Sequence, residues 1–332
     1  MRRRHAQRGV ALLVVLWATA LLTIMLAAYA VTTRTEGLQA RYQFDQTRAR
    51  YAAEAGIARA VYGLRESDPK RRWIADGRPY TFQFDNAKIK VTLHDESGKI
   101  DLNAATPQLL TGLFHAAGLD HDKAEALSEA VQDWRDADDA TRPNGAERAQ
   151  YREAGRDYGP RNGPFVTIEE LQMVLGMNAA LYTRIAPAIT VWSGRNSPNV
   201  GSAPALVLQA LPGMDAEKAS QYIQLRQQRN SSAQPAPTGI IGGMTAMGGG
   251  NGNTQDIHAV ATLPNGVRAA VDAVVRFGGA PSGGAPYRVL HWRYGEAGQA
   301  SSDARGASRG GPVRGKDATG PQGAGGLRLG AR

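Results

Sequence analysis

The sequence predicts an α+β fold with a long N-terminal helix, an antiparallel sheet made in two separated pieces, and a helical insertion between the pieces. Three observations predict it: an uncharged apolar run near the N-terminus, period-two alternation in two distant segments, and helical periodicity in between. The chain of 332 residues is 42% hydrophobic and 21% charged, which is typical of globular domains and excludes a wholly disordered chain. With no cysteine, disulfides, thiolate nucleophiles and cysteine-based zinc sites are also excluded.

A basic segment and an apolar run open the chain. Four arginines lie within residues 1–9, and residues 10–33 then form a run of 24 residues without a charge. A helix of roughly 20 residues crosses a hydrocarbon core of about 30 Å, so residues 10–33 are predicted to be a transmembrane helix. The basic flank places the N-terminus in the cytoplasm and the bulk of the chain across the membrane. The alternative is a secretory signal cleaved after Ala28-Tyr29-Ala30, although such signals have apolar regions of only about 7–15 residues.

The helical pattern continues beyond the apolar run. Residues 34–68 are predicted to be its amphipathic continuation, ended by Asp68-Pro69. The apolar positions recur at spacings of three, four or seven: Leu38, Tyr42, Ala49, Ala53, Ile57, Val61 and Leu64. One helix from Val10 to about Glu66 follows from this pattern.

Two segments alternate as strands do. Residues 72–98 contain a hairpin signal around Asp85-Asn86, and residues 254–295 contain three further strands at 257–263, 267–277 and 287–294. Asn265-Gly266 predicts a type I′ turn between the first two of these strands. The economical interpretation is one antiparallel sheet that is interrupted by a long insertion.

The insertion, residues 99–228, is predicted to be helical and contains a weak internal repeat. Each copy has an N-x-x-[T/S]-[P/A] motif, an apolar helix, a glycine turn and a second helix. The motifs start at Asn103 and Asn199, and the turns lie at Gly118 and Gly213. The second helices end near Arg135 and Arg226. Predicted N-caps are Thr106, Asp120, Ser202 and Asp215. A related helix-turn-helix is predicted to run through Thr167–Leu171, with its turn at Gly176-Met177-Asn178. The pattern resembles the helix-hairpin-helix of nucleic-acid-binding proteins, but residues 95–200 hold 10 basic and 16 acidic residues, so packing modules are preferred over phosphate binding.

Acidic residues gather around a turn in this insertion. They are Asp133, Asp136, Asp138, Asp139 and, beyond Pro143-Asn144-Gly145, Glu147. Several carboxylates on one loop suit a hard cation such as calcium. An EF-hand template that starts at Asp136 fails at Ala140 and Thr141, so the cluster is not an EF-hand. From composition alone, a solvated acidic helix end is the commoner explanation.

Motifs of catalysis are missing from the sequence. There is no nucleophile elbow, phosphate loop, HExxH or dinucleotide fingerprint, and the histidines offer only the pair His115 and His121 on either side of a predicted turn. The chain is therefore predicted not to be an enzyme. The Gly-rich segment 230–255 and the C-terminal residues 296–332 are predicted to be disordered.

The N-terminus resembles a known leader. Residues 7–13, Gln-Arg-Gly-Val-Ala-Leu-Leu, resemble the class III leader of type IV prepilin-like proteins. This resemblance implies that residues 1–9 are removed by a prepilin peptidase between Gly9 and Val10, that Val10 is N-methylated, and that the apolar helix stays attached. Most such proteins carry a glutamate at the fifth mature position, which here is Val14. A carboxylate within lipid costs about 2.5–3.5 kcal/mol and is kept only when it is paired.

The body of the chain resembles type II secretion system protein K, the general secretion pathway protein K family. The similar stretches are Asp95–Asn103, Asp133–Asp139, Asn144–Glu147, Pro164-Phe165, Glu169–Leu171 and Leu211–Met214. The resemblance implies a minor pseudopilin of the inner membrane with a periplasmic body and a pseudopilin sheet. Members are described as lacking the fifth-position glutamate and as capping the pseudopilus tip.

The same resemblance implies partners and a metal. The expected partners are the I-type and J-type minor pseudopilins, the major pseudopilin and the prepilin peptidase, and the expected role is to initiate the pseudopilus that exports folded proteins across the outer membrane. Calcium binding in the helical domain is implied, and the residues that match are Asp136, Asp138, Asp139 and Glu147. The alternatives are a minor pilin of a type IV pilus and a membrane-tethered DNA-binding helix-hairpin-helix protein.

Overall fold

The computed structural model describes residues 8–228, 240–241, 244–245, 252–278 and 285–295. Residues 1–7 of the predicted leader, most of the Gly-rich segment 230–255 and the whole segment 296–332 lie outside the described residues. The expectations about them are therefore untested.

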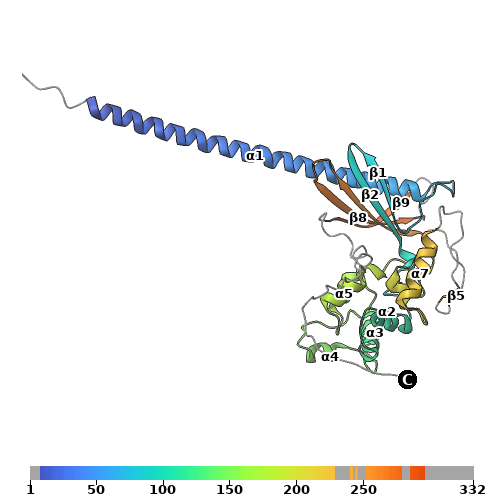
Figure 1. The fold of residues 1–332 in the computed structure, drawn as a ribbon. Helices are drawn as coiled ribbons and strands as arrows, with labels where there is room; N and C mark the ends of the chain where they lie inside the picture. Colours follow the sequence, from blue (N-terminus) through green and yellow to red (C-terminus); the bar gives the residue numbers. More distant parts are fainter. Residues whose placement is uncertain (1–7, 229–239, 242–243, 246–251, 279–284, 296–332) are drawn as a thin grey trace, which may run out of the picture. The chain divides into compact units, whose positions relative to one another are not determined.

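One uninterrupted helix, α1 (Arg8–Leu64), forms the N-terminal part of the chain (Figure 1). It joins the predicted transmembrane segment to its amphipathic continuation and ends two residues before the predicted Glu66. In its first half, hydroxyls of Thr19, Thr23, Thr32 and Thr33 donate to backbone carbonyls three or four residues back. These polar groups are satisfied within the helix, which is what a hydrocarbon environment demands.

The sheet has five strands in the order β1-β2-β7-β8-β9, and all neighbours are antiparallel. The strands are β1 (Asp76–Phe84), β2 (Ala87–Asp95), β7 (Thr254–Thr262), β8 (Arg268–Phe277) and β9 (Tyr287–Gly295). Because β2 pairs with β7, two segments about 160 residues apart in sequence share one sheet, with Lys88 opposite Thr262 and Asp95 opposite Gln255. The predicted strands and the interruption of the sheet are confirmed.

The turn prediction was wrong in one place. The backbone φ angles of Asp85 and Asn86 are 45° and 61°, so the type I′ turn joins β1 to β2. Between β7 and β8, Gly266 alone has a positive φ, of 87°, and Leu263 N–H donates to the Val267 carbonyl at 2.9 Å. Pro264 fixes its own φ at a negative value and lengthens this loop.

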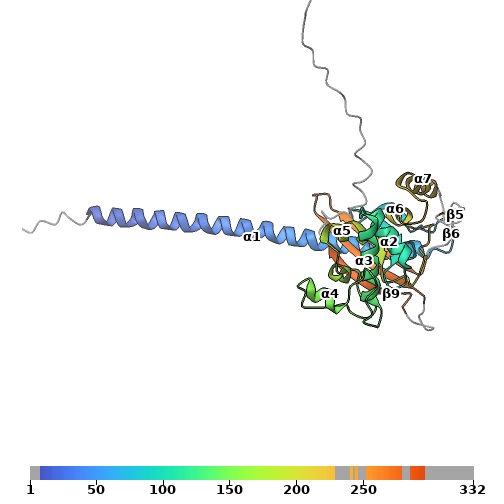
Figure 2. The same cartoon turned by 90° about the horizontal axis from the view of Figure 1, so that it is seen from below.

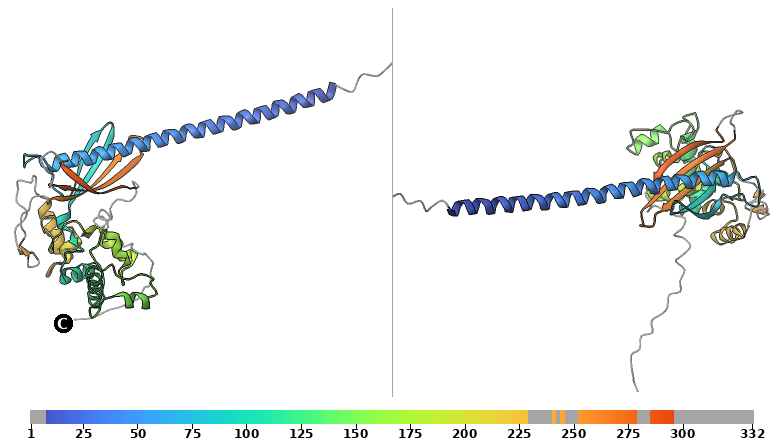
Figure 3. Two further views of the ribbon diagram at one scale, coloured as in Figure 1. Left: turned by 180° about the vertical axis from the view of Figure 1, so that it is seen from behind. Right: turned by 90° about the horizontal axis from the view of Figure 1, so that it is seen from above.

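The second half of α1 covers one face of the sheet (Figure 3). Its buried side chains are small and recur at helical spacing: Ala49, Ala52, Ala53, Ile57, Ala60, Val61 and Leu64. They pack against alternate residues of the central strands, such as Ile89 and Ala259. Gly56 lies at the closest approach, since a Cβ there would be 3.0 Å from both Ala259 Cβ and Ile89 Cγ2. The small residues therefore let the helix axis lie close to the sheet.

The insertion forms a separate hydrophobic core (Figure 2). Its helices are α2 (Pro107–Ala116), α3 (His121–Arg135), α4 (Arg148–Glu153), α5 (Ala179–Ile185), α6 (Ala205–Gln209) and α7 (Ala216–Gln227), with 3₁₀ turns η1 (Glu96–Gly98), η2 (Ile168–Met173) and η3 (Ala186–Ala188). The description of the insertion as all-α needs correction, because β3 (Ile100–Asp101) pairs in parallel with β4 (Ile189–Thr190). This bridge joins the segment before α2 to the segment after η3. A two-residue pair, β5 (Ile240–Ile241) with β6 (Met244–Thr245), lies in the Gly-rich segment.

Three of the four predicted N-caps are confirmed. The side chains of Thr106, Asp120 and Asp215 accept the N–H groups of Leu109, Lys123 and Lys218. The prediction for Ser202 was wrong, since α6 begins at Ala205 and its N-cap is Pro204. The third predicted helix-turn-helix differs in its first arm, which is the 3₁₀ turn η2, whereas α5 follows the predicted turn at Gly176-Met177-Asn178.

Two arginines reveal the true register of the internal repeat. At the end of α3, Arg135 donates to the carbonyls of Leu102 and Ala105 at 2.5 and 2.8 Å. At the end of α7, Arg226 donates to the carbonyls of Val200 and Ala203 at 3.4 and 2.8 Å. Leu102 and Val200 are thus equivalent, two residues away from the register that the asparagine motifs predicted. Each arginine holds the loop that enters the first helix of its own hairpin.

Buried charges join the insertion to the sheet. Lys99 Nζ lies 2.6 Å from Glu96 Oε1 and 2.8 Å from Asp256 Oδ2 on β7. The other Glu96 oxygen accepts the hydroxyl of Thr190 on β4. Both carboxylates raise the pKa of Lys99 and keep it charged despite burial. Breaking one member of such a network leaves an uncompensated buried charge, so the network fixes the junction.

We expect Gly56→Leu to destabilise the packing of α1 on the sheet by about 1–3 kcal/mol, because the new side chain overpacks against Ala259 and Ile89. Thermal unfolding followed by circular dichroism in detergent measures this. The matched control is Gly37→Leu in the same helix, where a Cβ meets nothing within 4 Å. Equal melting temperatures for the two variants would contradict the close approach.

Candidate functional site

The first half of α1 is the largest apolar surface of the described chain. Residues 11–43 are exposed throughout, and Val14 at the predicted fifth mature position is 62% exposed. This is the one helix among the described residues that is long and apolar enough to cross a membrane. Gly9 and Val10 lie in the first turns of α1, which places the predicted cleavage site at the start of the helix.

A row of aromatic side chains extends the exposed surface along the second half of α1. Phe44, Tyr51 and Tyr62 are 64–68% exposed. Their spacings of 7 and 11 residues put them on one helix face, opposite the small residues that contact the sheet. We call these three residues the aromatic stripe. A stripe of this kind on an otherwise solvated helix is typical of a protein interface.

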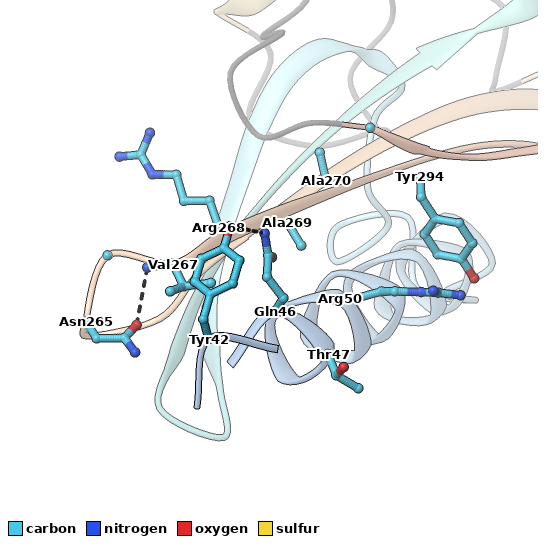
Figure 4. A pocket seen from close by; sticks show the side chains of 12 residues that line it. Tyr42, Gln46, Thr47, Arg50, Asn265, Val267, Arg268, Ala269, Ala270 and Tyr294 are labelled. Carbon is cyan, nitrogen blue, oxygen red and sulfur yellow. Dashed lines mark hydrogen bonds between the residues drawn. The ribbon is translucent and has the colours of Figure 1, made fainter. Parts of the chain in front are cut away.

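A groove lies beside α1, between that helix, the β7–β8 turn and strand β9 (Figure 4). Its volume is about 870 Å³. On its wall, the Arg50 guanidinium lies 3.5 Å from the centre of the Tyr294 ring, and the Tyr294 hydroxyl donates to Glu54 at 3.0 Å. Figure 4 shows Tyr42, Gln46 and Arg50 projecting from α1 on one side of this groove.

The acidic loop follows α3 and closes on an arginine. Asp133 is fully buried in the last turns of α3, and Asp136 caps the helix. Arg142 Nη1 lies 2.5 Å from Asp133 Oδ1 and 2.5 Å from Asp136 Oδ2. The loop backbone passes close over Asp133, since a Cβ on Gly145 would clash with its Oδ2. Burial lowers the pKa of Arg142, but the hydrogen bonds that it donates to Asp136 and Asp133 outweigh this effect, so the pKa is raised and the guanidinium stays charged.

Glu147 lies at the far end of the same loop and is only 4% exposed. Burial, followed by the charges of Asp133, Asp136 and Asp139, raises the pKa of Glu147 to about 7. Its two carboxylate oxygens have no close hydrogen-bond partner within the described part of the chain, although backbone N–H groups at the start of α4 face them. Asp136 Oδ1 and Asn162 Oδ1 are likewise buried without a partner. Unpartnered buried oxygens are costly, so the donor atoms at this place suit a hard cation.

The structure brings the four predicted calcium ligands to one loop but does not arrange them as a metal centre. The Asp138 Oδ1 accepts the N–H of Ala140 at 2.9 Å, and Asp139 Oδ1 accepts the Asn162 amide at 2.8 Å. Across the described residues, no group of three or more His, Asp or Glu side chains is placed to hold a metal ion. The donors nevertheless fit a hard cation by type, because carboxylate and amide oxygens are what calcium binds.

The sequence did not indicate two residues that contact the acidic side chains of this loop. Asn162 has a left-handed backbone with a φ of 51°, and Arg142 supplies the counter-charge. The Asn162-Gly163 dipeptide is a turn signal that could have drawn attention to the first of them. Nothing in the local sequence indicates that Arg142 turns toward Asp133.

The two histidines that the sequence pairs lie on a second cavity, of about 710 Å³. It is enclosed by α2, α3 and the turn Leu211–Met214 between α6 and α7, and Arg142 and Pro143 also line it. His115 Nδ1 is 3.0 Å from the Leu119 carbonyl, which ties this ring to its own turn. The pair carries no metal site.

The fold consists of a long helix with an exposed apolar first half, whose second half packs on an antiparallel sheet. A chain of the crystal structure of the GspK-GspI-GspJ complex from the enterotoxigenic Escherichia coli type 2 secretion system matches with a TM-score of 0.54, over 78% of this chain and 100% of that chain, at 18% identity. At that identity the likeness shows the fold alone.

The sequence comparisons specify the family. Residues 91–194 match the sequence model described as type II secretion system protein K. Type II secretion system protein K of Klebsiella pneumoniae is 30% identical over 206 residues, covering 56% of this chain, and that of Pseudomonas aeruginosa is 27% identical over 245 residues, covering 67% of this chain and 73% of that protein. The chain is therefore similar to type II secretion system protein K in sequence and in fold. The matched region spans 63% of the Klebsiella pneumoniae relative's length.

We expect Glu147→Gln to raise the melting temperature in chelator at pH 8 by about 2–5 °C, because it removes a buried negative charge that three other carboxylates repel. The folded-state pKa lies above the ordinary 4.5, so ionisation of Glu147 costs stability as the pH rises from 4.5 through about 7. The same variant should lose any stabilisation by added calcium. Scanning fluorimetry with and without calcium measures both effects.

Glu153→Gln is the matched control, with the same change of charge at an exposed position of α4. It should behave as the unmodified protein does. If calcium stabilises the Glu147→Gln variant as strongly as the control, Glu147 is not a ligand.

Proposed function

We propose that the chain is a minor pseudopilin that caps the tip of a type II secretion pseudopilus and helps to initiate its assembly for export of folded proteins across the outer membrane. The observation that carries the proposal is the combination of an exposed apolar helix half with sequence similarity to type II secretion system protein K. The role is structural and involves no catalytic step.

The anchor follows from α1. Residues 11–33 are apolar and exposed, so they lie in the inner membrane as a single span, with the arginines at the N-terminus on the cytoplasmic side. The sheet and the insertion then lie in the periplasm. Removal of residues 1–9 and methylation of Val10 leave this span attached to the mature protein.

Val14 supports a position at the tip. A glutamate within lipid needs a partner such as the terminal ammonium of a neighbouring subunit. Val14 offers no carboxylate, so this chain forms no such pair with a subunit ahead of it. The inserted helical region adds bulk on the periplasmic side of the same subunit, which opposes stacking of a further subunit.

The partners are other minor pseudopilins of the I and J types, together with the major pseudopilin. The similar solved structure is a complex of GspK with GspI and GspJ. In this chain, the aromatic stripe and the groove between α1 and β9 are the surfaces of the described part that suit such partners. Large exposed aromatic rings are characteristic of interface anchors.

The two repeated hairpins act as helix-hairpin-helix-like packing modules. They contact each other directly, since a Cβ on Gly112 of α2 would clash with the carbonyl oxygen of Ala210, which ends α6. The excess of acidic residues in residues 95–200 disfavours the binding of nucleic-acid phosphates. Nucleic acid is therefore not a proposed partner.

The acidic loop binds calcium in this proposal. The residues that would hold the ion are Asp136 and Glu147, with the amide oxygen of Asn162, and Asp138 and Asp139 lie on the same loop. Calcium would supply positive charge to oxygens that are buried and unpartnered. Its contribution is to the stability of the insertion and not to a reaction.

We expect Gly9→Leu to block processing, because the peptidase cuts after a glycine. An unprocessed precursor should accumulate in the membrane fraction and migrate more slowly on a gel. Gly37→Leu, far from the cleavage site, should be processed normally. Normal processing of Gly9→Leu would contradict the leader assignment.

We expect Phe44→Ala combined with Tyr51→Ala to reduce co-purification with the I-type and J-type pseudopilins at least about tenfold, because two exposed anchors are lost. Gel quantification after affinity purification from detergent extracts measures this. The control is Val166→Ala, another exposed apolar residue that lies in the insertion. Unchanged co-purification of the double variant would show that the stripe is not the interface.

A further inference from the structure

Arg142 bridges two carboxylates of the acidic loop. Its Nη1 is 2.5 Å from one oxygen of Asp133 and 2.5 Å from one oxygen of Asp136. Calcium takes its oxygen ligands at about 2.3–2.6 Å, so an ion bound to the same two oxygens would lie close to the guanidinium and be repelled by its positive charge. We propose that Arg142 is an internal counter-cation that competes with calcium for Asp133 and Asp136 and thereby weakens the calcium affinity of the loop. This inference rests on the calcium site of the proposed function.

The competition explains why the carboxylates do not converge on a common point. Within the described residues, no three acidic or histidine side chains are arranged to hold a metal, although five acids lie near the turn. Asp133 and Asp136 instead point to the guanidinium of Arg142. Carboxylates that do not converge are therefore expected when Arg142 is paired with Asp133 and Asp136.

One guanidinium compensates this loop only in part. Both oxygens of Glu147, Asp136 Oδ1 and Asn162 Oδ1 are buried and have no close hydrogen-bond partner in the described part of the chain. A guanidinium carries a single charge and donates along fixed directions, whereas calcium carries two and accepts six to eight oxygens at flexible angles. The oxygens that Arg142 leaves unsatisfied are the source of the additional binding energy for the ion.

The displaced side chain has room and alternative partners. Arg142 lines the cavity of about 710 Å³ between α2, α3 and the Leu211–Met214 turn, and Glu125 and Glu129 line the same cavity. The Arg142 side chain is 34% exposed, so part of it already faces solvent. The loop backbone is held separately, because Asn144 N–H donates to Glu129 at 2.5 Å. Exchange of the cation thus requires movement of a side chain and not refolding of the loop.

The test is the calcium dissociation constant of the full mature chain in detergent, stripped with chelator and titrated calorimetrically with calcium alone. We expect Arg142→Gln to bind calcium at least about tenfold more tightly than the unmodified protein. Arg148→Gln is the control: it removes the same charge from an exposed position next to Glu147, and we expect a change of less than about threefold because solvent screens exposed charges.

A purely structural role of Arg142 predicts the opposite result. In that case Arg142→Gln would loosen the loop and weaken calcium binding, so unchanged or weaker binding by this variant overturns the competition while leaving the calcium site intact. Absence of calcium binding in both the unmodified protein and Arg142→Gln overturns the calcium site and this inference with it. If Arg142→Gln does not fold, Arg142→Lys decides: it keeps the charge but loses the fork that bridges two carboxylates, and it should bind calcium more tightly than the unmodified protein.

Discussion

The apolar first half of α1 contacts no other described part of the protein. Its side chains therefore need an apolar environment outside the protein's own core. Residues 11–33 leave a continuous hydrophobic surface, with the hydroxyls of Thr19, Thr23 and Thr32 bonded back to the helix. Water is a poor environment for such a surface, and lipid or the helices of neighbouring subunits are good ones. The second half of the same rigid helix is fixed to the sheet by small residues around Gly56. The helix therefore joins its exposed apolar half directly to the sheet.

Buried ion pairs connect the sheet to the insertion. Lys99 holds Glu96 and Asp256 together at the junction, and Arg135 and Arg226 each hold the loop that precedes their own hairpin. The acidic loop after α3 uses the same device, with Arg142 between two aspartates. The two places differ in how well their polar groups are paired. In the hairpins, the arginines donate to backbone carbonyls, whereas several buried oxygens of the acidic loop have no hydrogen-bond partner. The loop is accordingly the place in the insertion where the proposed cation would change the free energy of unfolding.

Periodicity predicted the elements of this fold because periodicity is local. The long helix, the hairpin around Asp85-Asn86 and the three later strands all follow from spacings that a single segment contains. Errors arose where distant residues decide the outcome. The repeat was misaligned by two residues because its real landmark is the contact of Arg226 with the Val200 and Ala203 carbonyls, which the asparagine motifs do not report. Acid spacing placed Asp136 and Glu147 on one loop, but it could not reveal that Arg142 turns inward or that Asn162 joins from another segment.

The uncovered helix half is expected to remain on the mature protein as its anchor. Intact-mass spectrometry of the unmodified protein, purified separately from the membrane and soluble periplasmic fractions, measures where the mature chain begins. We expect a chain that begins at N-methylated Val10 and is recovered from the membrane in detergent. A chain that begins after Ala30 and is recovered from the soluble periplasmic fraction would contradict this expectation.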